Sequence, residues 1–230
     1  MKDNKIFNEW YGLPLLEDRI ATITDKELEL RGWTRETMRT TYYKRLEQDR
    51  LAPDIGDSVP NFELQIVHHS KNRPAYTKMK LSDLYGKPVG LIFGSYTCPP
   101  FRHWSERIVE ITNKFSDKVN FLVVYIKDAH PTDGSQAPDN LDMYDNVLFK
   151  QPTTLSERAE LAKICKQKLN FSCPMVIDDM DNSIELQYCA YPERLYLLDA
   201  TGCVFYKSVV GTYGYKPDEF EAAIKDILDV

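Results

Sequence analysis

Short apolar segments rich in β-branched residues recur along most of this 230-residue chain, and longer amphipathic segments separate them. The apolar segments cover residues 62–67, 89–93, 121–126 and 175–177. Even the longest is far below the ~20 apolar residues that a membrane-spanning helix needs. Strands of this kind are typically buried in a sheet whose faces are covered by helices. The alternation therefore predicts a soluble α/β fold.

The order of the elements narrows the fold further. Helices are expected at residues 99–115, 155–169 and 217–228. Near the C-terminus, residues 195–198 and 203–206 flank a turn that ends in Gly202, which predicts an antiparallel hairpin. Strand, helix, strand, helix, strand, hairpin and helix in succession is the thioredoxin-like arrangement, a central mixed sheet flanked by helices.

The N-terminal quarter of the chain is expected to lie outside that arrangement. We predict a helical extension over residues 1–55 and a thioredoxin-like domain over residues 56–230. Thr34 suits the N-cap of a helix that runs to about Arg50, and Pro53 ends it. The extension carries more aromatic residues than an isolated helix can bury, among them Trp10, Tyr11, Trp33, Tyr42 and Tyr43. We expect it to pack on the core or across a homodimer interface.

Charge and composition exclude several classes of protein. The net charge of −6 provides no basic surface for nucleic acid or an anionic membrane. Because the N-terminus lacks an apolar signal core, the expected location is the reducing cytoplasm. The sequence contains no CxxC or HExxH motif and no histidines at zinc-ligand spacings. We therefore expect no metal site and no organic cofactor.

Cys98 has the sequence context of a reactive thiol. An apolar strand precedes it and Pro99 and Pro100 follow it at the start of a helix. Proline is well suited to the first helical position, which makes Cys98 the N-cap. A thiolate there is stabilised by the helix dipole, so we expect a pKa below ~8.5 and rapid alkylation. The alternative is that Cys98 is only a small buried apolar residue.

Cys173 is a candidate partner for Cys98. The chain has five cysteines, and the position that would hold the second thiol of a CxxC pair is Phe101. Cys173 precedes Pro174 at the start of an apolar strand, where thioredoxin-like folds place a cis-proline facing the active-site helix. We therefore hypothesise that Cys173 lies beside Cys98 and resolves it as a disulfide. A buried, reduced cysteine is the alternative.

A third cluster of polar residues follows the strand at 121–126. Catalytic groups in open α/β sheets gather where parallel strands end, and this is also the end that presents Cys98. Asp128 and His130 are therefore expected to face the thiol. His130 is a candidate proton donor or substrate hydrogen-bonding group, and Asp128 would orient it. A purely structural histidine is the alternative.

Taken together, these motifs resemble the iodothyronine deiodinase family. The matching segments are GSYTCPPF at 94–101, YIKDAHPTDG at 125–134, Cys-Pro at 173–174 with Asp178 and Met180, and PERLY at 192–196. The family has selenocysteine at the position of Cys98, and often a cysteine at the position of Tyr96. The resemblance spans residues 56–230.

The resemblance implies a thioredoxin fold and a reductive chemistry. Members of the family remove iodine from phenolic rings of thyroid hormones with the aid of an external thiol. Cys98 would then be the attacking atom, while His130 and Glu193 would hold the substrate. Further substrate contacts are expected from the same motifs: Tyr96, Thr97, Phe101, Pro174 and Arg194. The expected partners are a small, aromatic or halogenated substrate and a thioredoxin-, glutathione- or dithiol-type reductant.

Two other functions are compatible with the same residues. A helix-cap cysteine can also reduce hydroperoxides through a sulfenic acid, which would make the protein a peroxiredoxin-like peroxidase. Alternatively, the site serves non-redox acid–base or nucleophilic catalysis in a biosynthetic pathway.

Overall fold

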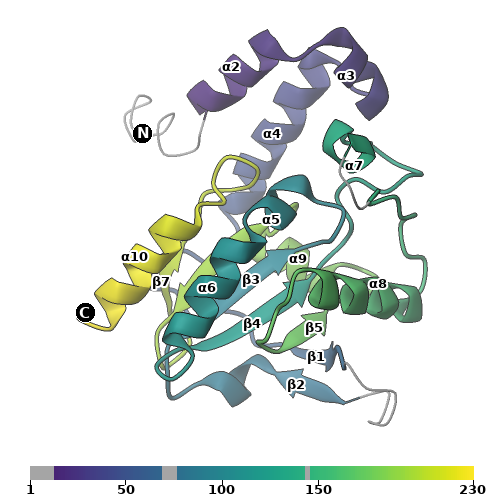
Figure 1. The fold of residues 1–230 in the computed structure, drawn as a ribbon. Helices are drawn as coiled ribbons and strands as arrows, with labels where there is room; N and C mark the ends of the chain where they lie inside the picture. The colour runs from purple at the N-terminus through teal and green to yellow at the C-terminus, as the bar shows by residue number, and fades with distance from the viewer. Residues whose placement is uncertain (1–12, 69–76, 143–145) are drawn as a thin grey trace.

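The computed structural model describes residues 13–68, 77–142 and 146–230, and in them a seven-stranded sheet with helices on both faces (Figure 1). The strand order is β2-β1-β5-β4-β3-β6-β7. The strands are β1 (Glu63–Ile66), β2 (Lys78–Lys80), β3 (Val89–Gly94), β4 (Asn120–Tyr125), β5 (Met175–Ile177), β6 (Arg194–Leu198) and β7 (Val204–Lys207).

The strand directions confirm the predicted thioredoxin-like fold. Strands β3, β4 and β5 are parallel, whereas β6 pairs antiparallel with β3 and forms the predicted hairpin with β7. The first apolar segment differs from the expected βαβ unit. Strand β1 is antiparallel to β5, and only a single 3₁₀ turn, η1 (Leu81–Leu84), separates β2 from β3. That connection is too short for a crossover helix.

Two apolar cores lie on opposite faces of the sheet. One face is covered by α6 (Ser105–Phe115), α8 (Leu155–Lys168) and α10 (Pro217–Ile227), which bury Ile108, Leu161 and Phe220 against it. The other face is covered by η1 and α9 (Ser183–Tyr188), which bury Leu81 and Tyr188. The strands between the cores are buried on both sides, and this is why they read as continuous apolar runs.

The helix predicted at 99–115 is interrupted. It consists of α5 (Pro99–His103) and α6, and Trp104 between them departs from helical geometry. The Ser105 hydroxyl donates a 2.7 Å hydrogen bond back to the Arg102 carbonyl at this point. A serine side chain that competes for a backbone carbonyl in this way favours a helix boundary.

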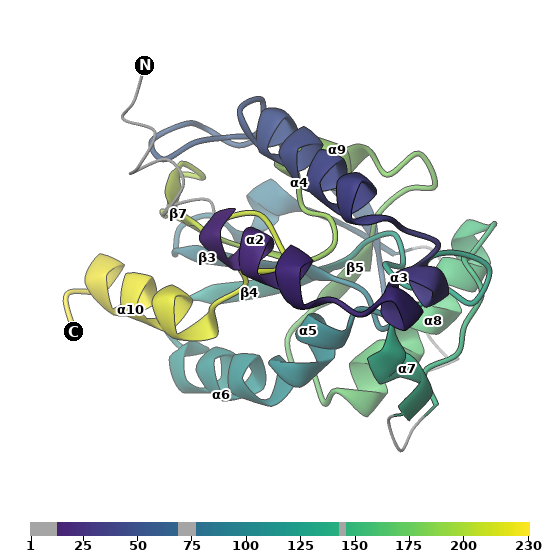
Figure 2. The same cartoon turned by 90° about the horizontal axis from the view of Figure 1, so that it is seen from above.

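The N-terminal helices lie over the end of the sheet where α5 begins (Figures 1 and 2). They are α2 (Leu13–Thr22), α3 (Asp25–Arg31) and α4 (Arg35–Asp49). Thr34 is the N-cap of α4 as predicted, and it forms a capping box with Thr37. Gly32 ends α3 with φ 63°, a left-handed conformation that glycine adopts without strain. Helices α2 and α3 lie in the predicted helical extension, within which only the helix of α4 was given bounds. The sequence pattern did not predict α7 (Pro138–Asp142) and α9, which are short.

The extension packs on the core, which is one of the two arrangements expected from its aromatic content. Its buried apolar residues form a third cluster that includes Cys189 and Val210 of the following domain. Tyr42 makes an edge contact with Tyr213 of that domain, at a ring separation of 5.9 Å. Trp10 and Tyr11 lie outside the described residues. Over the described ranges, the helices are all too short or too polar to cross a bilayer.

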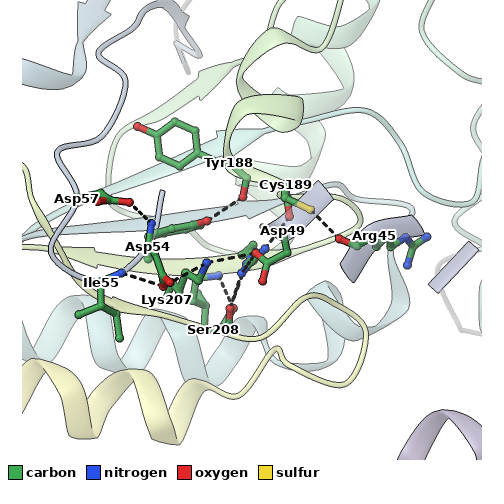
Figure 3. Close-up of polar contacts among 12 residues, drawn as sticks. Arg45, Asp49, Asp54, Ile55, Asp57, Tyr188, Cys189, Lys207 and Ser208 are labelled. Carbon is green, nitrogen blue, oxygen red and sulfur yellow. Dashed lines mark hydrogen bonds and ion pairs between the residues drawn. The ribbon is translucent and has the colours of Figure 1, made fainter. Parts of the chain in front are cut away.

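A buried ion pair ties α4 to β6. Asp49, the last residue of α4, is 2.7 Å from the guanidinium of Arg194, and both side chains are almost fully buried. Lys207 on β7 lies 3.4 Å from the same carboxylate (Figure 3). Arg194 also donates to the carbonyls of Ser208 and Cys189. The carboxylate therefore neutralises a charge that the sheet would otherwise bury alone.

We expect Asp49→Asn to lower the free energy of unfolding by about 3–5 kcal/mol, because the Arg194 charge would stay buried without its counterion. The measurement is urea denaturation followed by circular dichroism. Asp54→Asn is the control, because Asp54 is exposed and lies 3.5 Å from Lys207. It should cost less than about 1 kcal/mol. Equal losses in the two variants would contradict the role of the buried pair.

Candidate active site

Cys98 lies where the sequence predicts it, immediately beyond β3. The strand ends at Gly94, residues 95–97 make a short turn, and Cys98 is the N-cap of α5 with Pro99 in the first helical turn. The Arg102 backbone N–H donates to the Cys98 carbonyl at 3.2 Å and closes the first turn. The strand, the turn and the two prolines together fix where the thiol lies.

The environment of the thiol differs from the expected one. Cys98 is 1% exposed, and its Sγ donates a 2.7 Å hydrogen bond to Oε2 of Glu193. Burial and the neighbouring carboxylate both disfavour the thiolate, so the pKa of Cys98 lies well above its ordinary value. The Phe101 backbone N–H and the Arg102 guanidinium act in the opposite direction and do not offset these effects. The predicted low pKa is therefore wrong for the resting protein.

Glu193 is the carboxylate that controls this thiol. It is fully buried just before β6, and its Oε1 has no hydrogen-bond partner among the described residues. Burial raises the pKa of Glu193 to about 7. Gly211 leaves room for the side chain, because a Cβ there would lie 2.6 Å from Oε1. A group with this pKa can exchange a proton with Cys98 near neutral pH.

Asp128 forms hydrogen bonds with two buried hydroxyl groups and none with the His130 ring. Its Oδ1 accepts hydrogen bonds from Thr97 at 2.7 Å and from Tyr125 at 2.9 Å. Burial raises the pKa of Asp128 to about 6. The expectation that Asp128 orients His130 is wrong, because its carboxylate is hydrogen-bonded to the hydroxyls of Thr97 and Tyr125 instead. Asp128 fixes the turn that carries Cys98.

His130 is held as a neutral ring. Its Nδ1 lies 2.8 Å from the Ser135 carbonyl, which can only accept, so Nδ1 carries the proton. Burial lowers the pKa of His130 to about 4, and Nε2 is therefore an unprotonated acceptor at neutral pH. In this state His130 can accept a hydrogen bond from a substrate but does not serve as the expected proton donor.

Arg102 and Asn140 join the two loops of the site, and the sequence pattern pointed to neither. Arg102 donates to the Tyr96 carbonyl and to Oδ1 of Asn140, at 2.6 and 2.7 Å. Asn140 in turn donates to the Thr97 carbonyl at 2.9 Å. The two residues are 38 positions apart, so no local sequence pattern shows that they are partners. Their bonds keep the turn before Cys98 next to the loop of His130.

Cys173 does not lie beside Cys98. It precedes β5, which is parallel to β4 and β3, so it lies at the edge of the sheet where these strands begin. Cys98 follows β3 at the opposite edge. The cis peptide bond before a proline lies at Tyr191–Pro192 instead, ahead of the antiparallel strand β6. Because β6 is antiparallel to β3, it begins at the edge where β3 ends, and the residues before it lie near Cys98. The prediction assigned this place to the residues before β5, which is a parallel strand.

Several expected substrate contacts have other roles. Phe101 is fully buried against Phe171 and Tyr215, and Tyr96 is buried beside Phe149. Pro174 is exposed next to Cys173 at the far edge. The Arg194 side chain lies on the opposite face of β6 from Glu193, because successive residues of a strand alternate. The expectation that Pro174 and Arg194 contact substrate is therefore wrong. For Tyr96, Phe101 and Thr97, which are buried as Cys98 itself is, the contact stays a prediction.

A cavity of about 180 Å³ lies between the N-terminal helices and this site. On the domain side it is lined by His130, Tyr191, Pro192 and Tyr213. Tyr191 donates to the Ala129 carbonyl at 3.1 Å and thereby stays next to the His130 loop. Cys98 does not line the cavity, and Glu193 follows directly after two of its wall residues. The thiol is thus adjacent to the cavity and shielded from it.

Comparison with known proteins identifies the family of this chain. The family model described as iodothyronine deiodinase matches residues 16–227, which includes most of the N-terminal helices. The chain belongs to the iodothyronine deiodinase family. It is 37% identical over 133 residues to type I iodothyronine deiodinase of Xenopus laevis, covering 58% of this chain and 50% of that protein. With thyroxine 5-deiodinase of Homo sapiens it shares 34% identity over 133 residues, covering 58% and 41%.

This deiodinase-family chain thus matches about half the length of its curated relatives. Among solved structures it resembles a thiol:disulfide interchange protein from Bacteroides sp., with a TM-score of 0.53, 14% identity and coverage of 77% and 92% of the two chains. Peroxidoxin BcpB from Mycobacterium tuberculosis gives a TM-score of 0.52 at 15% identity, with coverage of 76% and 98%. At these identities the structures show the shared fold.

We expect Cys98 to be alkylated by iodoacetamide more slowly than half-buried Cys203 at pH 7, because its pKa is raised. Glu193→Gln removes the carboxylate that favours the thiol, so the pKa of Cys98 should fall. Its alkylation should then accelerate by on the order of tenfold for each unit of that fall. The readout is mass spectrometry of Cys98 and Cys203 peptides over time, with Cys203 as internal reference. Slower or unchanged labelling in Glu193→Gln would contradict this assignment.

Proposed function

We propose that the protein is a thiol-dependent reductive dehalogenase that removes iodine from a small aromatic molecule, with Cys98 as nucleophile. The observation that supports this most directly is the 2.7 Å contact between the Cys98 thiol and the buried carboxylate of Glu193. The pair holds one exchangeable proton beside a soft nucleophile. Reductive dehalogenation of a ring needs both, because the carbon that loses halogen must gain a proton.

The first half of the reaction uses this pair. Glu193 takes the proton of the Cys98 thiol as substrate enters. The sulfur electron pair then forms a bond to iodine, and the electron pair of the carbon–iodine bond stays on the ring carbon. Glu193 returns the proton to that carbon. The products are the dehalogenated ring, a sulfenyl iodide on Cys98 and the Glu193 carboxylate.

The second half needs an external thiol. One reductant thiol attacks the Cys98 sulfur, forms a mixed disulfide and releases iodide and a proton. A second reductant thiol then attacks that disulfide, restoring the Cys98 thiol and leaving the reductant oxidised. An external reductant fits the position of Cys173 at the opposite edge of the sheet. Thioredoxin, glutathione or another dithiol would serve, and a reducing cytoplasm would supply them.

The surrounding residues have positioning roles in this proposal. Nε2 of His130 accepts a hydrogen bond from a phenol group, which turns the halogenated carbon toward Cys98. Asp128 holds the turn before Cys98 through Thr97 and Tyr125. The raised pKa of Cys98 weighs against a peroxiredoxin-like function, since peroxide reduction needs a thiolate in the resting enzyme.

Cys98→Ser should abolish iodide release from iodophenols in the presence of dithiothreitol. Cys173→Ala is the matched control and should keep more than about half of the wild-type rate, since it lies at the other edge of the sheet. The same samples are assayed for peroxide-dependent consumption of dithiothreitol. Peroxide turnover without iodide release would favour the peroxidase. Activity retained in Cys98→Ser but lost in His130→Ala would favour the non-redox alternative.

The pH dependence follows from Glu193. The active pair needs an ionised Glu193 to accept the thiol proton, and the pKa of Glu193 is raised to about 7. We therefore expect kcat/KM to rise with pH and level off above about 7. In Glu193→Gln this acid limb should disappear and kcat should fall by about 10²–10⁴-fold. Both enzymes are measured with one substrate, so its ionisation affects them equally. An unchanged acid limb in Glu193→Gln would refute the assignment.

A further inference from the structure

The cavity beside the active site is built largely by the N-terminal helices. Their contribution includes Arg19 on α2, Arg31 on α3, Trp33 between α3 and α4, and Arg45 on α4. The domain contributes the aromatic rings of Tyr191 and Tyr213 together with His130. The extension therefore forms one wall of the cavity beside the Cys98–Glu193 pair.

The charges around this cavity do not balance. Three arginines line it, against a single carboxylate, Glu27. Glu27 contacts Arg19 and lies 3.0 Å from the Arg31 guanidinium, so a single negative charge faces two positive charges. His130 adds no charge to this set, because its ring is neutral at neutral pH. The cavity is consequently a positively charged space that favours an anion.

Arg45 differs from the other two cavity arginines in its partners: its charge acts on the buried carboxylates of Glu185 and Glu193 but forms no direct ion pair with either. Within the described ranges, no acidic side chain lies within ion-pair distance of it, and its guanidinium lies 5.0 Å from the centre of the Tyr191 ring. Figure 3 shows this side chain pointing away from the Asp49 cluster, although both come from α4. Arg45 is half-buried, and its charge favours ionisation of Glu193. A partly desolvated guanidinium on a cavity wall is well suited to bind a carboxylate.

The volume of the cavity is close to that of a single aromatic ring. A cavity of about 150 Å³ holds benzene. The 180 Å³ between the helices and the domain therefore accommodates one substituted ring. The rings of Trp33, Tyr191 and Tyr213 provide apolar walls for such a ring.

We propose that Arg45 binds the carboxylate of the substrate, and that the substrate is a single-ring aromatic acid with its ring between the N-terminal helices and Tyr191. The helices then form a specificity wall whose position is fixed by Asp49, one turn along α4 from Arg45. This subsite rests on the proposed dehalogenation for its chemistry, but it makes its own prediction about binding.

Binding is measured first, by calorimetry with the full chain. The probes are 4-hydroxybenzoate, its methyl ester and the two-ring acid 4-(4-hydroxyphenoxy)benzoate. The acid should bind at least about tenfold more tightly than the ester, as expected when a charge-assisted bond to the guanidinium is lost. The two-ring acid should bind more weakly than the single-ring acid. Equal affinity for acid and ester, or tighter binding of the two-ring acid, would overturn the proposal.

Variants test the residue itself. Arg45→Gln should weaken binding of 4-hydroxybenzoate at least about tenfold and leave the ester unchanged, and Arg45→Lys should restore part of the loss. Lys44→Gln is the control, because it removes the same charge from an exposed neighbouring position outside the cavity. Thermal melting checks that each variant is folded. Similar losses in Arg45→Gln and Lys44→Gln would assign the effect to overall charge and refute the proposal.

Turnover separates this proposal from the proposed function. Iodide release is compared for 3-iodo-4-hydroxybenzoate and its methyl ester, and Arg45→Gln should raise KM for the acid with little effect on kcat. Equal KM values for acid and ester would refute the subsite while the dehalogenase function stands. Selective binding of 4-hydroxybenzoate without iodide release from either compound would refute the dehalogenase and leave the subsite intact.

Discussion

The start of β6 joins the two features on which the site depends. Glu193 and Arg194 are neighbours, and because strand residues alternate, they point in opposite directions. Glu193 receives the hydrogen bond of the Cys98 thiol, whereas Arg194 pairs with Asp49 at the end of α4. A shift of this strand end would therefore move both the proton partner of the thiol and the helix that walls the cavity.

Burial determines the chemistry that this arrangement supports. Solvent-exposed helix N-termini favour thiolates, but the α5 terminus is covered and a carboxylate lies against the sulfur. The same low-polarity environment raises the pKa of Glu193 to about 7 and lowers that of His130 to about 4. The resting site is thus a protonated thiol with a nearby base and a neutral histidine. In our proposal, substrate entry brings about the proton transfer that makes the nucleophile.

The sequence was most informative where neighbouring residues determine the structure. Thr34 and Pro99 mark helix starts through local backbone chemistry, and both positions are confirmed. Contacts between segments that are distant in the sequence were harder to predict. Glu193, the partner of Cys98, is 95 residues away in the sequence. Arg194 is adjacent to Glu193, and only the direction in which its side chain points keeps it away from the thiol. The error at Cys173 has the same origin, since the position of a strand's first residue depends on its direction within the sheet.

The central claim is that burial and Glu193 together keep Cys98 protonated at rest, and that Glu193 exchanges that proton with it. The most direct measurement is an ultraviolet titration of the Cys98 thiolate, obtained as the difference between proteins with and without the Cys98→Ser substitution. It is carried out both in the wild-type background and in the Glu193→Gln background. The account predicts a wild-type midpoint above the ordinary cysteine value of about 8.5, and a lower midpoint once Glu193 is replaced by glutamine. A wild-type midpoint below that value, or one that glutamine leaves unchanged, would contradict it.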